Sequence, residues 1–391
     1  MIKKITFWAN PFILYSITWI IVFAIYQLGW SKLCPDLTTG LLGFLLITII
    51  LSLFFGLLFQ SRGYLSYYQI KPIPQRLIKH SLIILYVLFF IEIIFARGIP
   101  LLSLLLGDSS VLYTEFGLPF IHVIVVNGLS VVFIISFFSL KLIESKLAKR
   151  RLRRYIIFSI IPFILIVNRG AVMNNILGAF ILTIILTPDK TKAIKRIIVG
   201  AVTLLFLFGL LGNLRTDANG SSRAILSIGR ATDEFKSSII PKEFFWSYLY
   251  IATPLANTQN TINNYNIGRN ELEDVKKLIL NEFVPTIISK RISDDNSKNN
   301  AELIVEQLNV SSVYGRIFTY IGWPGFYVMY LFMIFFIIIN IGLVSKKSFF
   351  FVPTIVVIDE IIIMNLFTNM FVFMGLVPQI FILILLSKFY K

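Results

Sequence analysis

Long apolar segments separated by short polar links recur along nearly the whole chain. A segment of about 20 apolar residues matches the helix length that crosses roughly 30 Å of hydrocarbon at about 1.5 Å per residue. The pattern predicts an all-α, polytopic membrane bundle of about ten helices, and the alternating segments of a membrane β-barrel do not occur. The ten helices are expected near residues 11–30, 41–59, 81–96, 118–140, 155–187 (two helices), 197–211, 317–344, 349–365 and 371–387.

One polar segment, residues 212–316, is far longer than the other links. Loops of this length are usually functional or disordered, and its aromatic and helical patterns indicate folded structure. Glu271 to Phe283 has the apolar spacing of an amphipathic helix, which we expect on the membrane surface or on the bundle. The aromatic stretch 244–250 suits an interfacial or re-entrant helix, and 294–300 reads as a mobile tip. We therefore expect one membrane domain, residues 1–391, with a large, partly helical loop.

Composition and charge agree with a membrane protein and orient it. Of the 391 residues, 57% are hydrophobic and only 14% charged, against about a quarter charged in soluble domains. Lys and Arg, which mark cytoplasmic loops, gather in alternate links. These basic links are residues 60–80, 141–154, 190–196 and 345–348. The alternation predicts that both termini are cytoplasmic and that the long loop is extracytoplasmic.

The same Lys and Arg excess explains the net charge of +16 without a nucleic acid partner, since the sequence has no basic, aromatic-interleaved soluble domain. The single cysteine, Cys34, allows no intrachain disulfide. Lys3 and Lys4 precede an apolar stretch that is long and lacks a small-residue cleavage pattern, so we expect an uncleaved first helix.

Several classes of chemistry have no signal in this sequence. Neither the Walker type nor the dinucleotide type of glycine motif occurs, so we expect no ATP or NAD cofactor. The two histidines, His80 and His122, do not form a cluster with metal-ligand spacing, so we expect no metal site. The acidic pair Asp294-Asp295 fits a solvated loop tip better than a metal site.

Arginines on the extracytoplasmic side are the sharpest candidates for chemistry. Arg169 stands between two apolar stretches, where it either occupies a tight hairpin or binds an anion. Arg215 follows the seventh predicted helix at the same surface, and Arg223, Arg230 and Arg316 lie on this side. Guanidinium groups suit bidentate contact with phosphate, so together these arginines predict a cationic pocket for a lipid that carries pyrophosphate.

Buried acids and loop aromatics leave two interpretations each. Glu92 and the Asp359-Glu360 pair lie inside apolar segments, where carboxylates serve as ion or proton sites or as structural partners of an arginine or a polar cavity. The aromatic side chains of the loop form either an interfacial belt or a platform that stacks against sugars. These aromatic residues are Trp246, Tyr248 and Tyr250.

Four short motifs together resemble the bacterial O-antigen and capsular repeat-unit polymerases of the Wzy type. They are Asn168-Arg169-Gly170, Gly212-Asn213-Leu214-Arg215, the stretch from Tyr248 to Asn257 with its Pro-Leu-x-Asn ending, and the late turn with Asn365 and Asn369. The likeness covers most of the chain. It departs after the loop, where many relatives carry an aspartate before a glycine and here Trp323 follows Gly322.

The resemblance implies a bundle similar to the GT-C-like glycosyltransferases in the bacterial cytoplasmic membrane. Two undecaprenyl-pyrophosphate-linked oligosaccharides would meet at its outer face. The hydroxyl of one would attack the anomeric carbon of the other, and the lipid pyrophosphate would leave. Membrane lipids and a chain-length regulator are the other expected partners.

On this hypothesis, cations stabilise the departing diphosphate. Arg169 and Arg215 take that role, with Arg230 or Arg316 assisting. Asn257, Trp246 and Tyr250 would contact substrate. Asp217, Asp233 and Glu234 lie on the same side and are candidates for the general base, and the sequence does not select among them. The alternatives are a ligase that moves finished polymer to an acceptor and a transporter with Glu92 and Asp359 as coupling sites, although the sequence shows no repeated halves.

Overall fold

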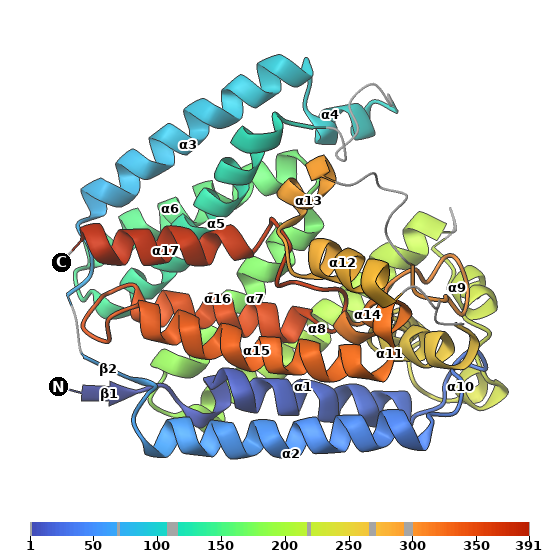
Figure 1. The fold of residues 1–391 in the computed structure, drawn as a ribbon. Helices are drawn as coiled ribbons and strands as arrows, with labels where there is room; N and C mark the ends of the chain where they lie inside the picture. The colour runs from blue at the N-terminus through green and yellow to red at the C-terminus, as the bar shows by residue number, and fades with distance from the viewer. Residues whose placement is uncertain are drawn as a thin grey trace.

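The computed structural model describes residues 2–68, 71–107, 116–216, 220–265, 271–292 and 300–390, and within them almost all of the regular secondary structure is helical (Figure 1). The long helices are α1 Pro11–Tyr26, α2 Thr39–Ser61, α3 Gln75–Ala96, α5 Pro119–Leu142, α6 Lys146–Leu165, α7 Arg169–Leu186, α8 Lys190–Thr216, α11 Phe244–Asn264, α15 Trp323–Leu343, α16 Phe351–Met364 and α17 Val377–Phe389. The short ones are η1 Phe7–Ala9, α4 Pro100–Leu105, α9 Arg223–Ile228, α10 Asp233–Ser237, α12 Glu271–Glu282, α13 Thr286–Ile292 and α14 Val313–Ile321. Strands β1 Ile2–Lys4 and β2 Ser66–Tyr68 pair antiparallel.

The predicted helical membrane bundle is present in outline. Each of the ten predicted helices overlaps an observed one; these are α1, α2, α3, α5, α6, α7, α8, α15, α16 and α17. Among the described residues, six of these helices, α2, α3, α5, α7, α8 and α15, are long and apolar enough to cross a membrane. Helices α1 and α17 are apolar but shorter. The chain is therefore a multi-pass helical membrane protein by the length and composition of its helices.

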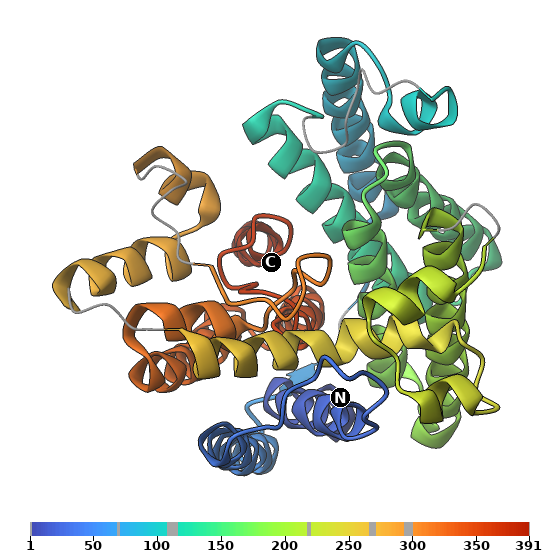
Figure 2. The same ribbon diagram turned by 90° about the vertical axis from the view of Figure 1, so that its right-hand side faces the viewer.

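The two ends of the bundle carry different elements. Both termini and the β1–β2 pair lie at one end, on the left of Figure 1, and the helices of the polar loop gather at the other. Helix α11, in yellow, runs across the view in Figure 2, beside the blue α1 and at an angle to the bundle helices. It contacts α1, α8 and α14, so the loop is folded onto this end of the bundle.

Two predicted elements have different bounds in the structure. The helix expected over residues 317–344 breaks at Gly322, where φ is +64° and ψ is −142°. Residues other than glycine rarely adopt that backbone conformation. Pro324 follows in the first turn of α15, where proline is favoured. The aromatic helix expected over 244–250 continues to Asn264, passing through Pro254, and most of its side chains are buried.

Helix α12 confirms the predicted amphipathic helix but packs through a different face. Leu278 and Glu282, one turn apart, are buried, whereas the apolar Leu272, Val275 and Ile279 are exposed. Side chains four residues apart share a helix face. The helix therefore contacts the rest of the protein through a partly polar face and leaves an apolar face uncovered, as a helix at a lipid surface does.

Candidate functional site

A cavity of about 540 Å³ lies where the loop meets the bundle. Its walls come from the end of α12, from the segment 300–312, from α14 and from the turn after α16. The lining residues are Glu282, Asn300, Ala301, Leu303, Asn309, Val310, Ser311, Ser312, Val313, Arg316, Phe367, Thr368 and Asn369.

The segment 300–312, which we call the strap, has no regular secondary structure and is held by side chains of α11. Asn257 is fully buried; its Nδ2 donates to the carbonyls of Leu308 and Val310 at 2.7 and 2.8 Å, and its Oδ1 accepts from Ile304 N at 2.8 Å. Thr258 Oγ1 lies 2.7 Å from Ser312 Oγ. Asn257, predicted to contact substrate, thus has its whole amide engaged in holding one wall of the cavity.

A charged pair closes the floor of the same cavity. Arg316 donates from Nε and Nη2 to the two carboxylate oxygens of Glu282, at 2.5 and 3.1 Å. Asn369 Nδ2 donates to Glu282 Oε2 at 3.0 Å and to the Glu282 carbonyl at 2.8 Å. Burial alone would lower the pKa of the Arg316 guanidinium, but the Glu282 carboxylate raises it above its ordinary value. The pair is therefore ionic, with both charges compensated.

The predicted arginines do not all come to this cavity. Arg316 lines it, whereas Arg169, the first residue of α7, and Arg230, in the turn before α10, are exposed and are not among the lining residues. Arg230 adopts a positive φ of 44°. The side chain of Arg215 and all of Asp217 lie outside the described residues.

The predicted aromatic residues divide between packing and the edge of the cavity. Trp246 Nε1 donates to Asn213 Oδ1 at 2.8 Å, and Tyr248 is buried against Trp30. Tyr250 is 43% exposed and its ring lies 6.4 Å from that of Phe367, which lines the cavity. Tyr250 is therefore the predicted aromatic residue best placed to meet a ligand there.

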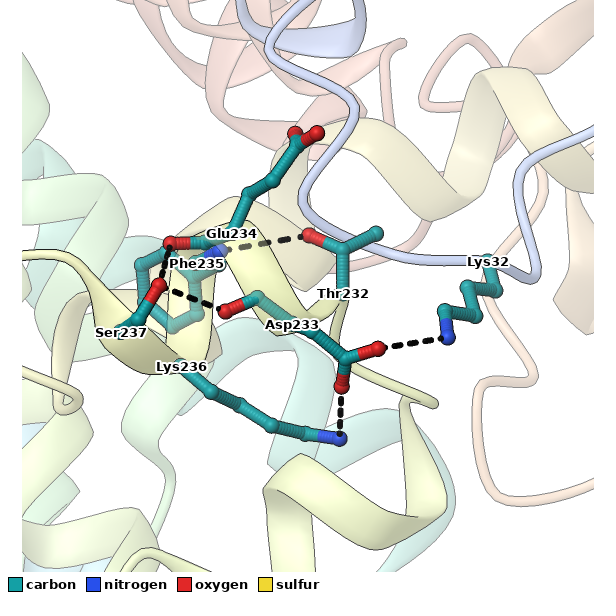
Figure 3. A network of polar contacts seen from close by, with 7 residues as sticks. All are labelled: Lys32, Thr232, Asp233, Glu234, Phe235, Lys236 and Ser237. Atoms are coloured by element: carbon teal, nitrogen blue, oxygen red, sulfur yellow. Dashed lines mark hydrogen bonds and ion pairs between the residues drawn. The ribbon is translucent and has the colours of Figure 1, made fainter.

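Of the candidate bases, Asp233 is held in an exposed ion-pair network (Figure 3). Its carboxylate lies between Lys32 and Lys236, at 3.2 Å from each Nζ. The hydrogen bonds from Lys236 and Lys32 keep the pKa of Asp233 below its ordinary value. Glu234 points away from this network in Figure 3. A carboxylate stabilised in its charged form is a poor proton acceptor, so Asp233 is a weak candidate for the base.

Sequence reasoning missed Glu282 and the strap. Glu282 follows the buried Leu278 by four residues and so lies on the same face of the helix. That spacing was the available signal. The strap has no periodicity, and its place depends on contacts made across more than 40 residues, such as that between Asn257 and Ile304.

Buried carboxylates form a second polar region inside the bundle. Asp359 and Glu360 on α16 are 0% and 1% exposed, and among the described residues both Asp359 oxygens and Glu360 Oε1 have no hydrogen-bond partner. Glu360 lies against Gly178 of α7, where an added Cβ would come within 2.1 Å of Oε1. Within the described part of the chain, neither acid pairs with an arginine, one of the partners that the sequence left open.

Glu92, the third acid predicted inside a helix, has a partner. Its Oε1 accepts from Leu118 N at 3.3 Å and lies 3.2 Å from His122 Nδ1. It thereby ties the end of α3 to the start of α5. In the part of the chain that the structure describes, no group of three or more His, Cys, Asp and Glu side chains is arranged to hold a metal ion.

Comparison with protein-family models, with curated proteins and with solved structures gives no significant match for this chain.

Proposed function

We propose that this protein is a membrane glycosyltransferase that joins lipid-diphosphate-linked oligosaccharides into a polysaccharide, as a repeat-unit polymerase. The observation that carries the proposal is the cavity between the strap, α12, α14 and the turn after α16, at the loop end of the bundle. Three of the sequence features named above meet at this place: Arg316, the asparagine turn with Asn365 and Asn369, and the stretch of α11 from Tyr248 to Asn257.

The proposed reaction forms a bond between an acceptor hydroxyl oxygen and the anomeric carbon of the donor sugar. The bond from that carbon to the diphosphate oxygen breaks, the hydroxyl proton leaves to a base, and the lipid diphosphate departs with the bonding electrons. The sugar–diphosphate bond is already activated, so no nucleotide site is needed. Charge grows on the leaving group, and a fixed cation near it lowers the barrier.

Arg169 remains the proposed cation for that role. Its side chain is exposed at the start of α7 and makes no hydrogen bond or ion pair with the described residues, so its charge is free to meet a diphosphate. Arg215 is proposed beside it on the sequence argument alone. Arg316 is a weaker partner for phosphate because Glu282 already neutralises it.

The test is turnover by the purified protein. The protein is incubated with lipid-diphosphate oligosaccharide, without nucleotide or added metal, and the products are separated on a gel. We expect a ladder of lengthened chains that is lost in Arg169→Ala and kept in the control Arg62→Ala, an exposed arginine at the end of α2. Normal ladders from Arg169→Ala would remove Arg169 from the mechanism. In cells whose only copy of the protein is the inactive Arg169→Ala variant, accumulation of long lipid-linked chains, rather than single units, would indicate a ligase.

A second candidate function, ion-coupled transport, is favoured by one observation. Asp359 and Glu360 are buried in α16 without partners among the described residues, and intramembrane acids commonly mark ion or proton pathways. Protein in sealed vesicles that moves lipid-linked oligosaccharide only under an ion gradient, and loses this with Asp359→Asn, would support transport. An unchanged product ladder from Asp359→Asn would support the enzyme.

A further inference from the structure

We infer that the cavity binds the uncharged sugar portion of the ligand and that the diphosphate lies outside it. The assignment of a sugar ligand rests on the proposed function. The exclusion of the diphosphate rests only on the charges and contacts of the cavity.

The first step concerns charge. Among the residues that the structure describes, Arg316 and Glu282 are the charged side chains that line the cavity, and they contact each other through two hydrogen bonds. Glu282 is fully buried and receives a further hydrogen bond from Asn369. A diphosphate carries at least two negative charges and is bound by cations that are free to pair with it. An arginine that is already paired with a buried carboxylate is not free to bind the diphosphate, and the carboxylate repels the anion.

The second step concerns the neutral lining. Residues with amide or hydroxyl side chains line the space from two segments, the strap and the turn after α16. Such groups donate and accept hydrogen bonds without net charge, as sugar hydroxyl groups do. Ser311 Oγ is buried and has no hydrogen-bond partner within the described residues. A buried hydroxyl without a partner costs free energy, and a ligand hydroxyl would supply that partner. The neutral polar residues of the lining are Asn300, Asn309, Ser311, Ser312, Thr368 and Asn369.

The third step concerns shape. The volume of about 540 Å³ falls within the range of about 300–1,000 Å³ typical of small-ligand sites, which suits a short oligosaccharide rather than a long polymer. Phe367 lines the space and Tyr250 lies beside it, with the two rings 6.4 Å apart. Aromatic rings offer an apolar face to the C–H side of a sugar while its hydroxyl groups bond to the polar wall.

The charge argument is tested with inorganic pyrophosphate and the purified full-length protein in detergent. We expect wild type and Arg316→Met to have the same pyrophosphate affinity. Glu282→Gln leaves Arg316 uncompensated, so its affinity should rise about tenfold, the gain expected of a charge-assisted contact. Thr368→Arg adds a cation to the wall without touching the buried pair, and it should give a similar gain if Glu282→Gln does not fold. A tenfold loss in Arg316→Met, or no gain in the folded charge variants, would overturn the inference.

The sugar argument uses the free oligosaccharide released from the lipid-linked substrate by mild acid, which carries no phosphate. We expect it to bind wild type and to bind Phe367→Ala about tenfold more weakly, as loss of one aromatic contact predicts. The matched control is Phe7→Ala, a partly exposed phenylalanine in η1, which follows β1 and does not line the cavity. No binding to wild type, or equal binding to Phe367→Ala, would overturn the sugar assignment. Binding without any product ladder would uphold it while the polymerase proposal fails.

Discussion

The buried polar residues at the loop end of the bundle and those inside the bundle differ in how many of their hydrogen-bonding atoms have partners. Around the strap, the buried Asn257, Glu282 and Asn369 each make several hydrogen bonds. In α16, Asp359 and Glu360 are just as buried, yet three of their four carboxylate oxygens have no partner in the described part of the chain. Burial is similar in the two regions, and hydrogen-bond satisfaction is not.

The difference separates two uses of a buried polar group. A buried polar side chain with all its partners in place stabilises and orients what it contacts. A buried polar side chain without partners lowers stability, so its presence points to another role, such as binding an ion, a proton or a ligand. The loop-end network is therefore best understood as the framework of a cavity, while α16 carries groups whose partners are not other side chains.

Removal of Glu282 should have the largest effect on stability. Glu282→Ala leaves the Arg316 guanidinium partly buried without its counter-charge, and breaking a buried pair from one side costs about 3–5 kcal/mol. Unfolding by denaturant in detergent measures the change. The double variant Glu282→Met with Arg316→Met is the control and should recover much of the loss. Equal losses in the two proteins would mean that packing, rather than charge, makes this region stable.

Release of the strap should have the next largest effect. Asn257→Ala removes three hydrogen bonds to residues 300–312, and the expected cost is about 2–3 kcal/mol. Hydrogen exchange should become faster in the strap while α15 is unchanged. Asn260→Ala removes one exposed bond to the strap, at the Glu302 carbonyl, and one exposed bond from Asn264 within α11. It is the matched control and should change little. Unaltered exchange in Asn257→Ala would show that the strap is held by other contacts.

Neutralising Glu360 should have a small effect, in contrast to Glu282. Glu360→Gln keeps the shape of the side chain, and Glu360 Oε1 has no hydrogen bond in the described residues to lose. We expect the free energy of unfolding to change by less than about 1 kcal/mol or to rise, because a buried charge without a partner is costly. A loss as large as that of Glu282→Ala would contradict the comparison and would indicate a bound cation at α16.

The smallest effect should come from the exposed network around Asp233. The pKa of Asp233 is lowered by hydrogen bonds from Lys236 and Lys32, so its contribution is complete above the ordinary Asp pKa. It is lost as the pH falls through and below that value. Since the side chains are solvent-exposed, the pair contributes little. The small difference in unfolding free energy between wild type and Asp233→Asn should therefore be present at neutral pH and disappear as the pH falls; a difference that persists unchanged in acid would contradict this.

Much of the fold could be predicted because it depends on local pattern. Runs of apolar residues predicted ten helices, and each of them overlaps an observed helix. The spacing from Glu271 to Phe283 predicted α12 almost to its last residue. The break at Gly322 was missed because it requires a positive φ rather than a change in polarity, although Pro324 was a local signal.

The candidate site was only partly predictable. Arg316 was named from the sequence, but as a free cation; its partner Glu282 lies 34 residues away. Asn257 was named as a substrate contact, and its amide is engaged with the strap instead. In both cases the residue type was informative, and the partner decided what the side chain is available to do.

The sequence by itself determined that this is a helical membrane protein with one large polar loop, because hydrophobicity and length act locally along the chain. Only the tertiary structure decided which polar groups are neutralised and which remain without partners. Pairing depends on side chains from distant segments meeting in space. That is why the charge of Arg316 is compensated while Asp359 is not, although both are polar residues beside apolar helices.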